Sequence, residues 1–234
     1  MEDPEVQTQT TERNESSISK KEILLKSGKK VELLTLHITQ MRLYHGSLVA
    51  GVTGFEEGDQ QSIGRGIYLT LQKEAASGYA SKRSGHDGVP TVYEVQISDL
   101  DIADLRTKEA QEEFAKLFKQ SLIEWEESVL PNLKGPSDEV LGVIKEQRKE
   151  AVRELVHKID TNTFLQLRDL TFGWADLVST TLSNVGYKGL MSIEGEPPDI
   201  DFHDSIVMFN PLDIRTINQE KAVPVMPPGR MGEY

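Results

Sequence analysis

The sequence predicts an α+β fold, because strand-like and helix-like segments are grouped along the chain. Short runs rich in Val, Ile and Tyr occur before residue 106 and again after residue 184. Between them, residues 108–130 carry apolar side chains at spacings of three and four, which is the helical period, and two further helical stretches follow. Grouped strands and grouped helices favour α+β over a regular alternation of strand and helix.

Composition limits the chemistry that the chain can perform. It has 234 residues, a net charge of -12 and no cysteine. This length favours one domain with additions, or two small domains. Disulfides, thiolate nucleophiles and cysteine metal ligands are excluded, so the chemistry depends on oxygen, nitrogen or a cofactor. The acidic balance opposes attraction to phosphate backbones, so nucleic acid is disfavoured as a partner.

Both ends of the sequence indicate tails. Residues 1–20 are rich in Glu, Gln, Thr and Ser and predict a disordered tail, and residues 221–234 predict a C-terminal tail. No run approaches the roughly 18 apolar residues of a membrane span, and the N-terminus is acidic and polar, unlike a signal peptide. We therefore expect no membrane partner and a cytoplasmic location as encoded; delivery into a host cell as an effector is left open.

The first half of the chain predicts strands around one short helix. Apolar runs between residues 22 and 47 predict two or three strands with a turn at "SGKK", with a helical alternative at 31–41. A glycine-rich loop at 51–66 precedes the strand "IYL". The Ala-rich stretch "LQKEAASGYASKRS" is compatible with a helix, and "TVYEVQISDL" predicts a strand.

The middle of the chain predicts three helices, and the end predicts strands. The strongest helical pattern lies in 108–130, where the apolar positions are Phe114, Leu117, Phe118, Leu122 and Trp125. Ser137 is a candidate N-cap for a second helix. A third helical stretch covers about 160–185, and strand character returns at 190–192 and 205–209.

Two short motifs in the first half of the chain carry the chemistry. "LYHGS" places His45 and Gly46 at the end of a predicted strand, and "GRGIYL" places Tyr68 on the strand that follows Gly64 and Gly66. Glycines allow a backbone to approach a ligand closely, and the aromatic ring of Tyr68 offers a flat face beside it. The pattern lacks the full dinucleotide fingerprint of a Rossmann fold.

Together, "YHGS" and "GRGIYLTLQKEAASGYA" resemble the His-Tyr branch of the ADP-ribosyltransferase superfamily, which includes poly(ADP-ribose) polymerases and diphtheria toxin-like enzymes. The ending "GYKGLM…DSIVMFNPLDIRTI" resembles the last strands of bacterial and phage members of that family. The resemblance implies a split pair of small sheets around an NAD cleft. It assigns this core to residues 21–106 and 184–220, and leaves residues 107–183 as a helical insertion.

The resemblance also implies which residues meet NAD, here as a substrate: His45, Gly46, Ser62, Gly66, Tyr68 and Tyr79. His45 would bond the ribose 2'-hydroxyl of the nicotinamide half, and the backbone of Gly46 would hold the carboxamide. Tyr68 and Tyr79 would lie on the two faces of the nicotinamide ring, with core packing as the alternative for Tyr79. Ser62 would contact the carboxamide or a phosphate.

A carboxylate near the ribose would stabilise the oxocarbenium-like transition state that forms when nicotinamide departs. The most active members of the family place a Glu just before the strand that "IVMFNP" matches, and this alignment puts Ser205 at that position. Asp204 fills it if the register slips by one residue, and we name it with His45 and Tyr68 as catalytic. Glu194 and Glu196 are further candidates.

The resemblance therefore implies a mono-ADP-ribosyltransferase that cleaves NAD and modifies a protein target, with the helical block helping to choose the target. An NAD glycohydrolase, a small-molecule ADP-ribosyltransferase and an inactive NAD-binding module are the alternatives. No metal is predicted, because no metal-like spacing relates the histidines outside the motif: His37, His86, His157 and His203.

Overall fold

The computed structural model describes residues 14–52, 54–55, 63–82, 88–161, 167–168, 173–196 and 200–223. The strands are β1 (Glu15–Leu24), β2 (Lys30–Ser47), β3 (Ile67–Thr70), β4 (Thr91–Asp104), β5 (Gly189–Glu196), β6 (Ile200–Met208) and β7 (Arg215–Lys221). The helices are α1 (Lys73–Lys82), α2 (Lys108–Ser128), α3 (Asp138–Asp160) and α5 (Ala175–Asn184), with short 3-10 turns η1 (Leu130–Asn132) and η2 (Pro211–Asp213). The α+β prediction is confirmed.

The strands form one connected sheet, so the predicted split pair of sheets is wrong. The order is β1-β2-β3-β6-β5-β4-β7, and an additional pairing of β2 with β4 closes a circuit through β3, β6 and β5. The length of β2 and β4 explains the closure. Along its outer edge β2 pairs first with β1 and then with β3, while β4 pairs first with β7 and then with β5. β2 and β4, the two longest strands, therefore belong both to the closed circuit and to the part of the sheet that carries β1 and β7.

The predicted disordered tail is wrong for residues 15–20, because these residues belong to β1. This strand runs antiparallel to β2 in an edge hairpin, from Ser16 opposite Ile38 to Leu24 opposite Lys30. Most β1 side chains are exposed, so the strand needs few apolar residues and its composition resembles that of a tail. The predicted turn is confirmed: Gly28 has a φ of 79°, which favours glycine.

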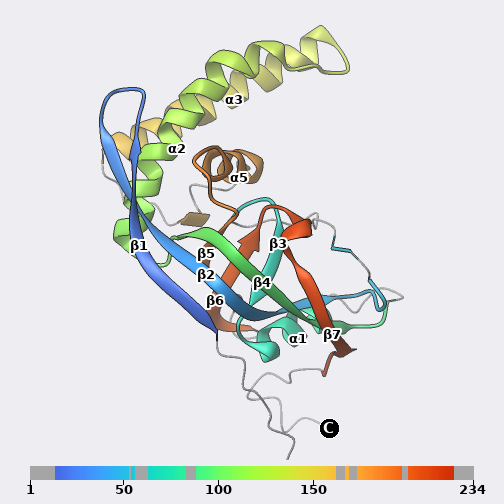
Figure 1. The fold of residues 1–234 in the computed structure, drawn as a ribbon. Helices are drawn as coiled ribbons and strands as arrows, with labels where there is room; N and C mark the ends of the chain where they lie inside the picture. Colours follow the sequence, from blue (N-terminus) through green and yellow to red (C-terminus); the bar gives the residue numbers. More distant parts are fainter. Residues whose placement is uncertain are drawn as a thin grey trace, which may run out of the picture.

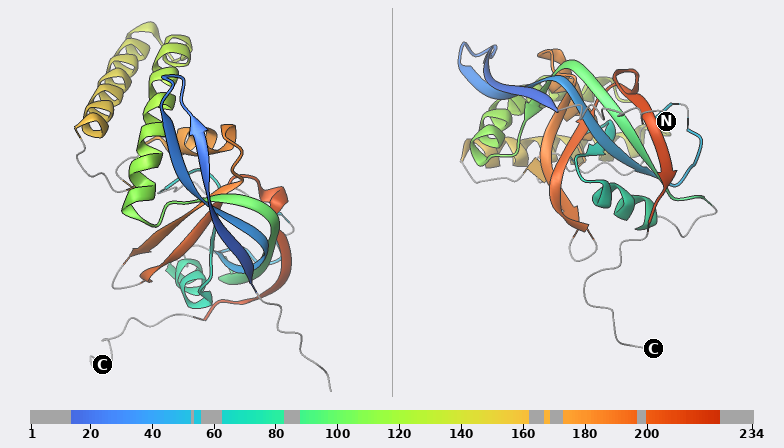
Figure 2. Two further views of the ribbon diagram at one scale, coloured as in Figure 1. Left: turned by 60° about the vertical axis from the view of Figure 1, so that its left-hand side comes forward. Right: turned by 60° about the horizontal axis from the view of Figure 1, so that its bottom comes forward.

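The predicted helices at 108–130 and after residue 137 are confirmed. Thr107 caps α2 by accepting a hydrogen bond from the backbone N–H of Ala110, and Ser137 caps α3 in the same way through Val140. α2 and α3 form a hairpin that projects from one end of the sheet, beside the β1–β2 hairpin, whereas α1 lies at the other end (Figures 1 and 2). Of the third predicted helix, α5 is present, and residues 162–166 and 169–172 lie outside the described part.

Two large apolar clusters hold these layers together. One lies between the sheet and the helices α2, α3 and α5, and it includes Phe114, Phe118, Val178 and Val207. The other is contributed by all five strands of the circuit, with side chains such as Leu43, Leu69, Val95, Met191 and Ile206. The apolar stripe predicted on the 108–130 helix is thus part of the core.

A buried phenol links the second strand to the segment before β5. The hydroxyl groups of Tyr187 and Thr35 lie 2.8 Å apart, and Tyr187 is buried. Burial raises the pKa of Tyr187 above its ordinary value, because the phenolate would lose its hydration. The folded state therefore holds this proton more tightly than the unfolded state does.

We expect this phenol to make stability depend on alkaline pH. Its contribution is complete below the unfolded tyrosine pKa of about 10 and is lost as the pH rises from there through the higher folded pKa, by up to about 1.4 kcal/mol per pH unit. Urea unfolding at pH 8 and at about pH 11 measures the loss. Tyr187→Phe should weaken this decrease; an equal decrease in both proteins would contradict the assignment.

Candidate functional site

The two sequence motifs meet where β2 and β3 separate. The ladder between these strands consists of one pair, Tyr44 opposite Thr70. Directly beyond it, Nδ1 of His45 lies 2.8 Å from the carbonyl oxygen of Tyr68. A carbonyl oxygen can only accept, so Nδ1 donates, and in the neutral imidazole Nε2 is then the acceptor nitrogen. The side chain of His45 thus bridges the two strands where their ladder ends.

Aromatic rings surround the imidazole of His45. Phe55 approaches it edge-on at 5.0 Å between ring centroids, and Tyr93 lies at 6.5 Å. The hydroxyl of Tyr93 donates to the carbonyl of Val49 and accepts from the N–H of Val52, which fixes the chain just after β2. The orientation of His45 is therefore set by its hydrogen bond to Tyr68 and by these two rings.

The phenol of Tyr68 fixes the glycine-rich turn that precedes β3. Its hydroxyl accepts from the N–H of Ile63 at 3.1 Å and donates to the carbonyl of Gly64 at 2.8 Å. The half-buried ring packs against the cluster formed with α2 and α5. The backbone of Arg65 is tied to α5 as well, since its carbonyl accepts from the hydroxyl of Ser179 at 2.7 Å.

Close backbone packing explains both glycines predicted to bind the cofactor. A Cβ atom on Gly46 would lie 2.0 Å from the carbonyl oxygen of Ala76 in α1, far inside van der Waals contact. A Cβ atom on Gly66 would lie 2.2 Å from the carbonyl oxygen of Met208 in β6. Gly46 and Gly66 therefore allow α1 and β6 to approach, and their roles toward NAD remain predictions.

A strip of buried polar side chains lies on one face of β3, β6 and β5, beside α1. Thr70, Ser205 and Ser192 are directly opposite one another in neighbouring strands and hence share a face. His203, two residues before Ser205, lies on that face too, and its Nε2 is 3.3 Å from the hydroxyl oxygen of Ser205. The rings of Tyr79 and His203 form a T-shaped contact with their centroids 5.6 Å apart.

Sequence reasoning missed His203, for which only a metal role was considered. His203, Ser205 and Val207 are spaced by two and share one face of β6. The other face is apolar too, at Ile206 and Met208, so alternation along this strand gives no signal that singles out His203.

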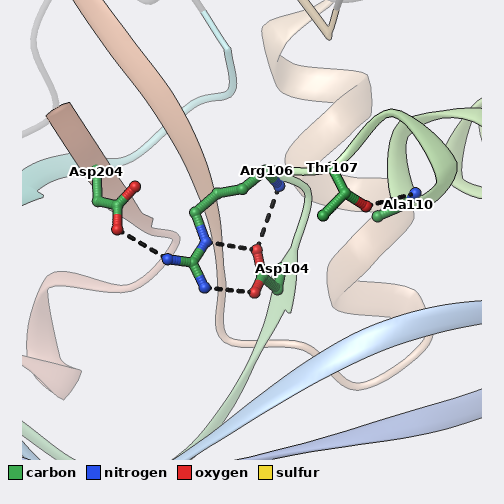
Figure 3. Close-up of polar contacts among 5 residues, drawn as sticks. All are labelled: Asp104, Arg106, Thr107, Ala110 and Asp204. Carbon is green, nitrogen blue, oxygen red and sulfur yellow. Dashed lines mark hydrogen bonds and ion pairs between the residues drawn. The ribbon is translucent and has the colours of Figure 1, made fainter. Parts of the chain in front are cut away.

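Asp204 takes part in a network of three charged side chains (Figure 3). The guanidinium of Arg106 lies 2.8 Å from the Asp204 carboxylate, and it donates two hydrogen bonds, of 2.9 and 2.7 Å, to Asp104. Asp104 is only 3% exposed. Its hydrogen bond is the main cause that raises the pKa of Arg106 above the ordinary value, and Asp204 adds to it.

The remaining candidate residues are two glutamates and one serine, and the structure describes only part of them. Glu194 lies opposite His203 in the β5–β6 ladder. The backbone of Glu196 lies in β5, but its side chain is outside the described part. Ser62 also lies outside the described residues.

In the part of the chain that the structure describes, no helix is long and apolar enough to span a membrane, and no group of three His, Asp or Glu side chains could hold a metal ion.

Two shallow hollows lie away from His45. One, of about 330 Å³, lies next to the glycine-rich turn and is lined by Arg65, Asp176, Ser179, Thr180, Ser183 and Phe209. The other, of about 490 Å³, lies on the α2–α3 hairpin and is lined by Ile123, Glu126, Glu127, Leu130, Pro131, Lys145, Glu146 and Lys149.

No family model matches the chain, and no curated protein matches it. Among solved structures, a chain of the M. tuberculosis MbcT–MbcA toxin–antitoxin complex is partly similar, with 11% sequence identity and a TM-score of 0.43. The similarity covers 81% of this chain and 87% of that one. Similarity of this degree does not define an activity.

Proposed function

We propose that this chain is an NAD-dependent mono-ADP-ribosyltransferase that cleaves NAD and transfers ADP-ribose to a protein target. The observation that supports this most is the hydrogen bond between His45 and the Tyr68 carbonyl. It brings together the two motifs on which the family resemblance depends, at the point where β2 and β3 separate.

The residues around this bond have complementary roles in the proposal. Nε2 of His45 accepts a hydrogen bond from a ribose 2'-hydroxyl, and the backbone of Gly46 holds the carboxamide. Tyr68 and Tyr79 stack on the nicotinamide ring, while Gly66 lets the backbone approach NAD. Ser62 contacts the carboxamide or a phosphate.

Bond cleavage follows from fixing the substrate in this way. The bond between the ribose carbon and the nicotinamide nitrogen breaks, its electron pair leaves with nicotinamide, and positive charge develops on the ribose. A nucleophile of the target protein attacks that carbon from the opposite face and loses its proton. Holding ring and ribose in a reactive geometry lowers the entropic part of the barrier.

Asp204 and Ser205 compete for the third catalytic position. Asp204 supplies a carboxylate, but Arg106 already binds it at 2.8 Å and offsets its negative charge. Ser205 lies opposite Thr70 of β3 and shares its face of β6 with His203. The imidazole of His203 in turn contacts the ring of Tyr79. These contacts favour Ser205. A hydroxyl stabilises positive charge less than a carboxylate does. For members without the Glu, the family resemblance implies transfer of a single ADP-ribose unit and no chain extension.

Nicotinamide release from NAD tests the proposal. The purified chain is assayed alone and with a cell lysate, beside His45→Ala and Tyr68→Ala. Loss of either side chain should reduce release at least tenfold, the equivalent of about 1.4 kcal/mol of transition-state stabilisation. His157→Ala, an exposed site on α3, is the matched control and should leave the rate unchanged.

Labelled NAD separates the alternatives. Label on a lysate protein supports transfer, whereas release without protein label indicates the glycohydrolase or small-molecule alternative. Absence of release in every condition would contradict the proposed enzyme and favour the inactive NAD-binding module.

A further inference from the structure

We infer that His203 is a positioning residue of the proposed site, which holds the hydroxyl of Ser205 and the ring of Tyr79 in place for the nicotinamide ring. The inference rests on the proposed function, since Tyr79 is proposed to stack on nicotinamide. His203 acts through these two neighbours and transfers no proton.

The first argument is burial. His203 is 3% exposed and Ser205 is 2% exposed, and Thr70 and Ser192 beside them are buried as well. Polar side chains are costly to bury unless they form hydrogen bonds, and a purely structural sheet face beneath a helix is normally apolar. The contact between Nε2 of His203 and the hydroxyl of Ser205, at 3.3 Å, satisfies part of this requirement.

The second argument is the contact with α1. Tyr79 meets His203 at 5.6 Å with 66° between the ring planes, which is the edge-to-face arrangement that aromatic pairs prefer. α1 itself is held against β2, because its backbone packs directly on Gly46. A T-shaped contact covers at most one face of the tyrosine ring, and it limits rotation of that ring. His203 thereby connects the strand that carries Ser205 to the helix that carries Tyr79.

The chemistry predicts a particular kinetic effect. Stacking on nicotinamide occurs in the ground state and is retained until the ring departs, so a misplaced Tyr79 weakens binding more than it slows bond cleavage. Loss of His203 should therefore raise KM for NAD and weaken nicotinamide binding, with a smaller change in kcat. A merely structural residue would instead lower the fraction of active protein and leave KM unchanged.

The experiment compares His203→Leu, His203→Gln and Ser205→Ala in the full chain, with His157→Leu as an exposed control. Steady-state nicotinamide release gives kcat and KM, and calorimetry gives the affinity for free nicotinamide. His203→Leu should raise KM and the nicotinamide Kd about tenfold each, with kcat within about threefold. His203→Gln, whose amide can still bond to Ser205 but offers no ring to Tyr79, should recover only part of the loss. Ser205→Ala added to His203→Leu should have little further effect on KM or on the nicotinamide Kd, because the two residues act through one contact. It should lower kcat, because Ser205 is the proposed third catalytic residue.

The outcomes separate the inference from the proposed function. A wild-type chain that releases nicotinamide while every His203 and Ser205 variant keeps its KM and nicotinamide affinity would overturn the inference alone. A wild-type chain that binds nicotinamide through His203 but cleaves no NAD would overturn the enzyme and retain the site. If His203→Leu fails to fold, His203→Gln and Ser205→Ala still decide the matter, since each changes only one end of the contact.

Discussion

Replacing Arg106 with Met is expected to lower the free energy of unfolding by about 3 kcal/mol, because it leaves a buried carboxylate without its cation. Asp104 is 3% exposed and receives two side-chain hydrogen bonds from Arg106, besides one from the Arg106 backbone. Removing one partner of a buried pair costs more than the pair contributes, since the remaining charge has lost its hydration. Urea unfolding followed by circular dichroism measures the change.

The matched control is Arg153→Met on α3. Arg153 lies 3.7 Å from Glu150, and both side chains are more than half exposed. Surface pairs of this kind contribute less than about 1 kcal/mol. If the Arg106 and Arg153 variants were equally stable, the network around Asp104 would have no special role in holding the sheet to α2.

Asp204→Asn separates the structural role of this network from the catalytic role named for Asp204. The Asp204 side chain is about one-third exposed, so losing its charge should cost less than about 1 kcal/mol. If Ser205 fills the third position, nicotinamide release should stay within about threefold of the wild-type rate. A loss of tenfold or more in a stable variant would instead assign the catalytic carboxylate to Asp204.

Local patterns in the sequence predict most of the elements correctly. The helical period of residues 108–130 and the cap at Ser137 depend on neighbours within a few positions, and both are present. The closure of the sheet is different. It depends on β2 and β4, each of which pairs with one neighbouring strand along its first part and with another along its last part. The periodicity within a single segment does not show which strands will pair with it. Residues 15–20 of β1 were missed because an exposed edge strand needs little apolar character.

Local sequence patterns likewise predict one part of the candidate site and miss another. His45 and Tyr68 stand in compact motifs, and a hydrogen bond joins them. The partner of Asp204, Arg106, lies 98 positions away, just before the helical block, so no local pattern could reveal that the Asp204 carboxylate is engaged. His203 and Tyr79 lie far apart in the sequence, and only the fold brings the two rings together.

Gly46→Ala is expected to destabilise the protein by about 3 kcal/mol, the upper part of the range for overpacking a core. The added methyl group would lie 2.0 Å from the carbonyl oxygen of Ala76 and 3.0 Å from the backbone nitrogen of Ala80. Both are backbone atoms of α1, so no side-chain rotation relieves the overlap. The helix must move away from β2, or the strand must bend.

The matched control is Gly142→Ala, in the interior of α3, where no atom lies within 4 Å of the added methyl group. Alanine lowers the backbone entropy of the unfolded chain, so this variant should gain about 0.5–1 kcal/mol. In urea unfolding, the same substitution is thus expected to change the free energy of unfolding in opposite directions at the two positions.

A displaced α1 also carries Tyr79 away from His203, so the Gly46 variant should bind nicotinamide more weakly even where it remains folded. If Gly46→Ala kept wild-type stability and lost only nicotinamide binding, its glycine would serve the ligand and not the packing of α1.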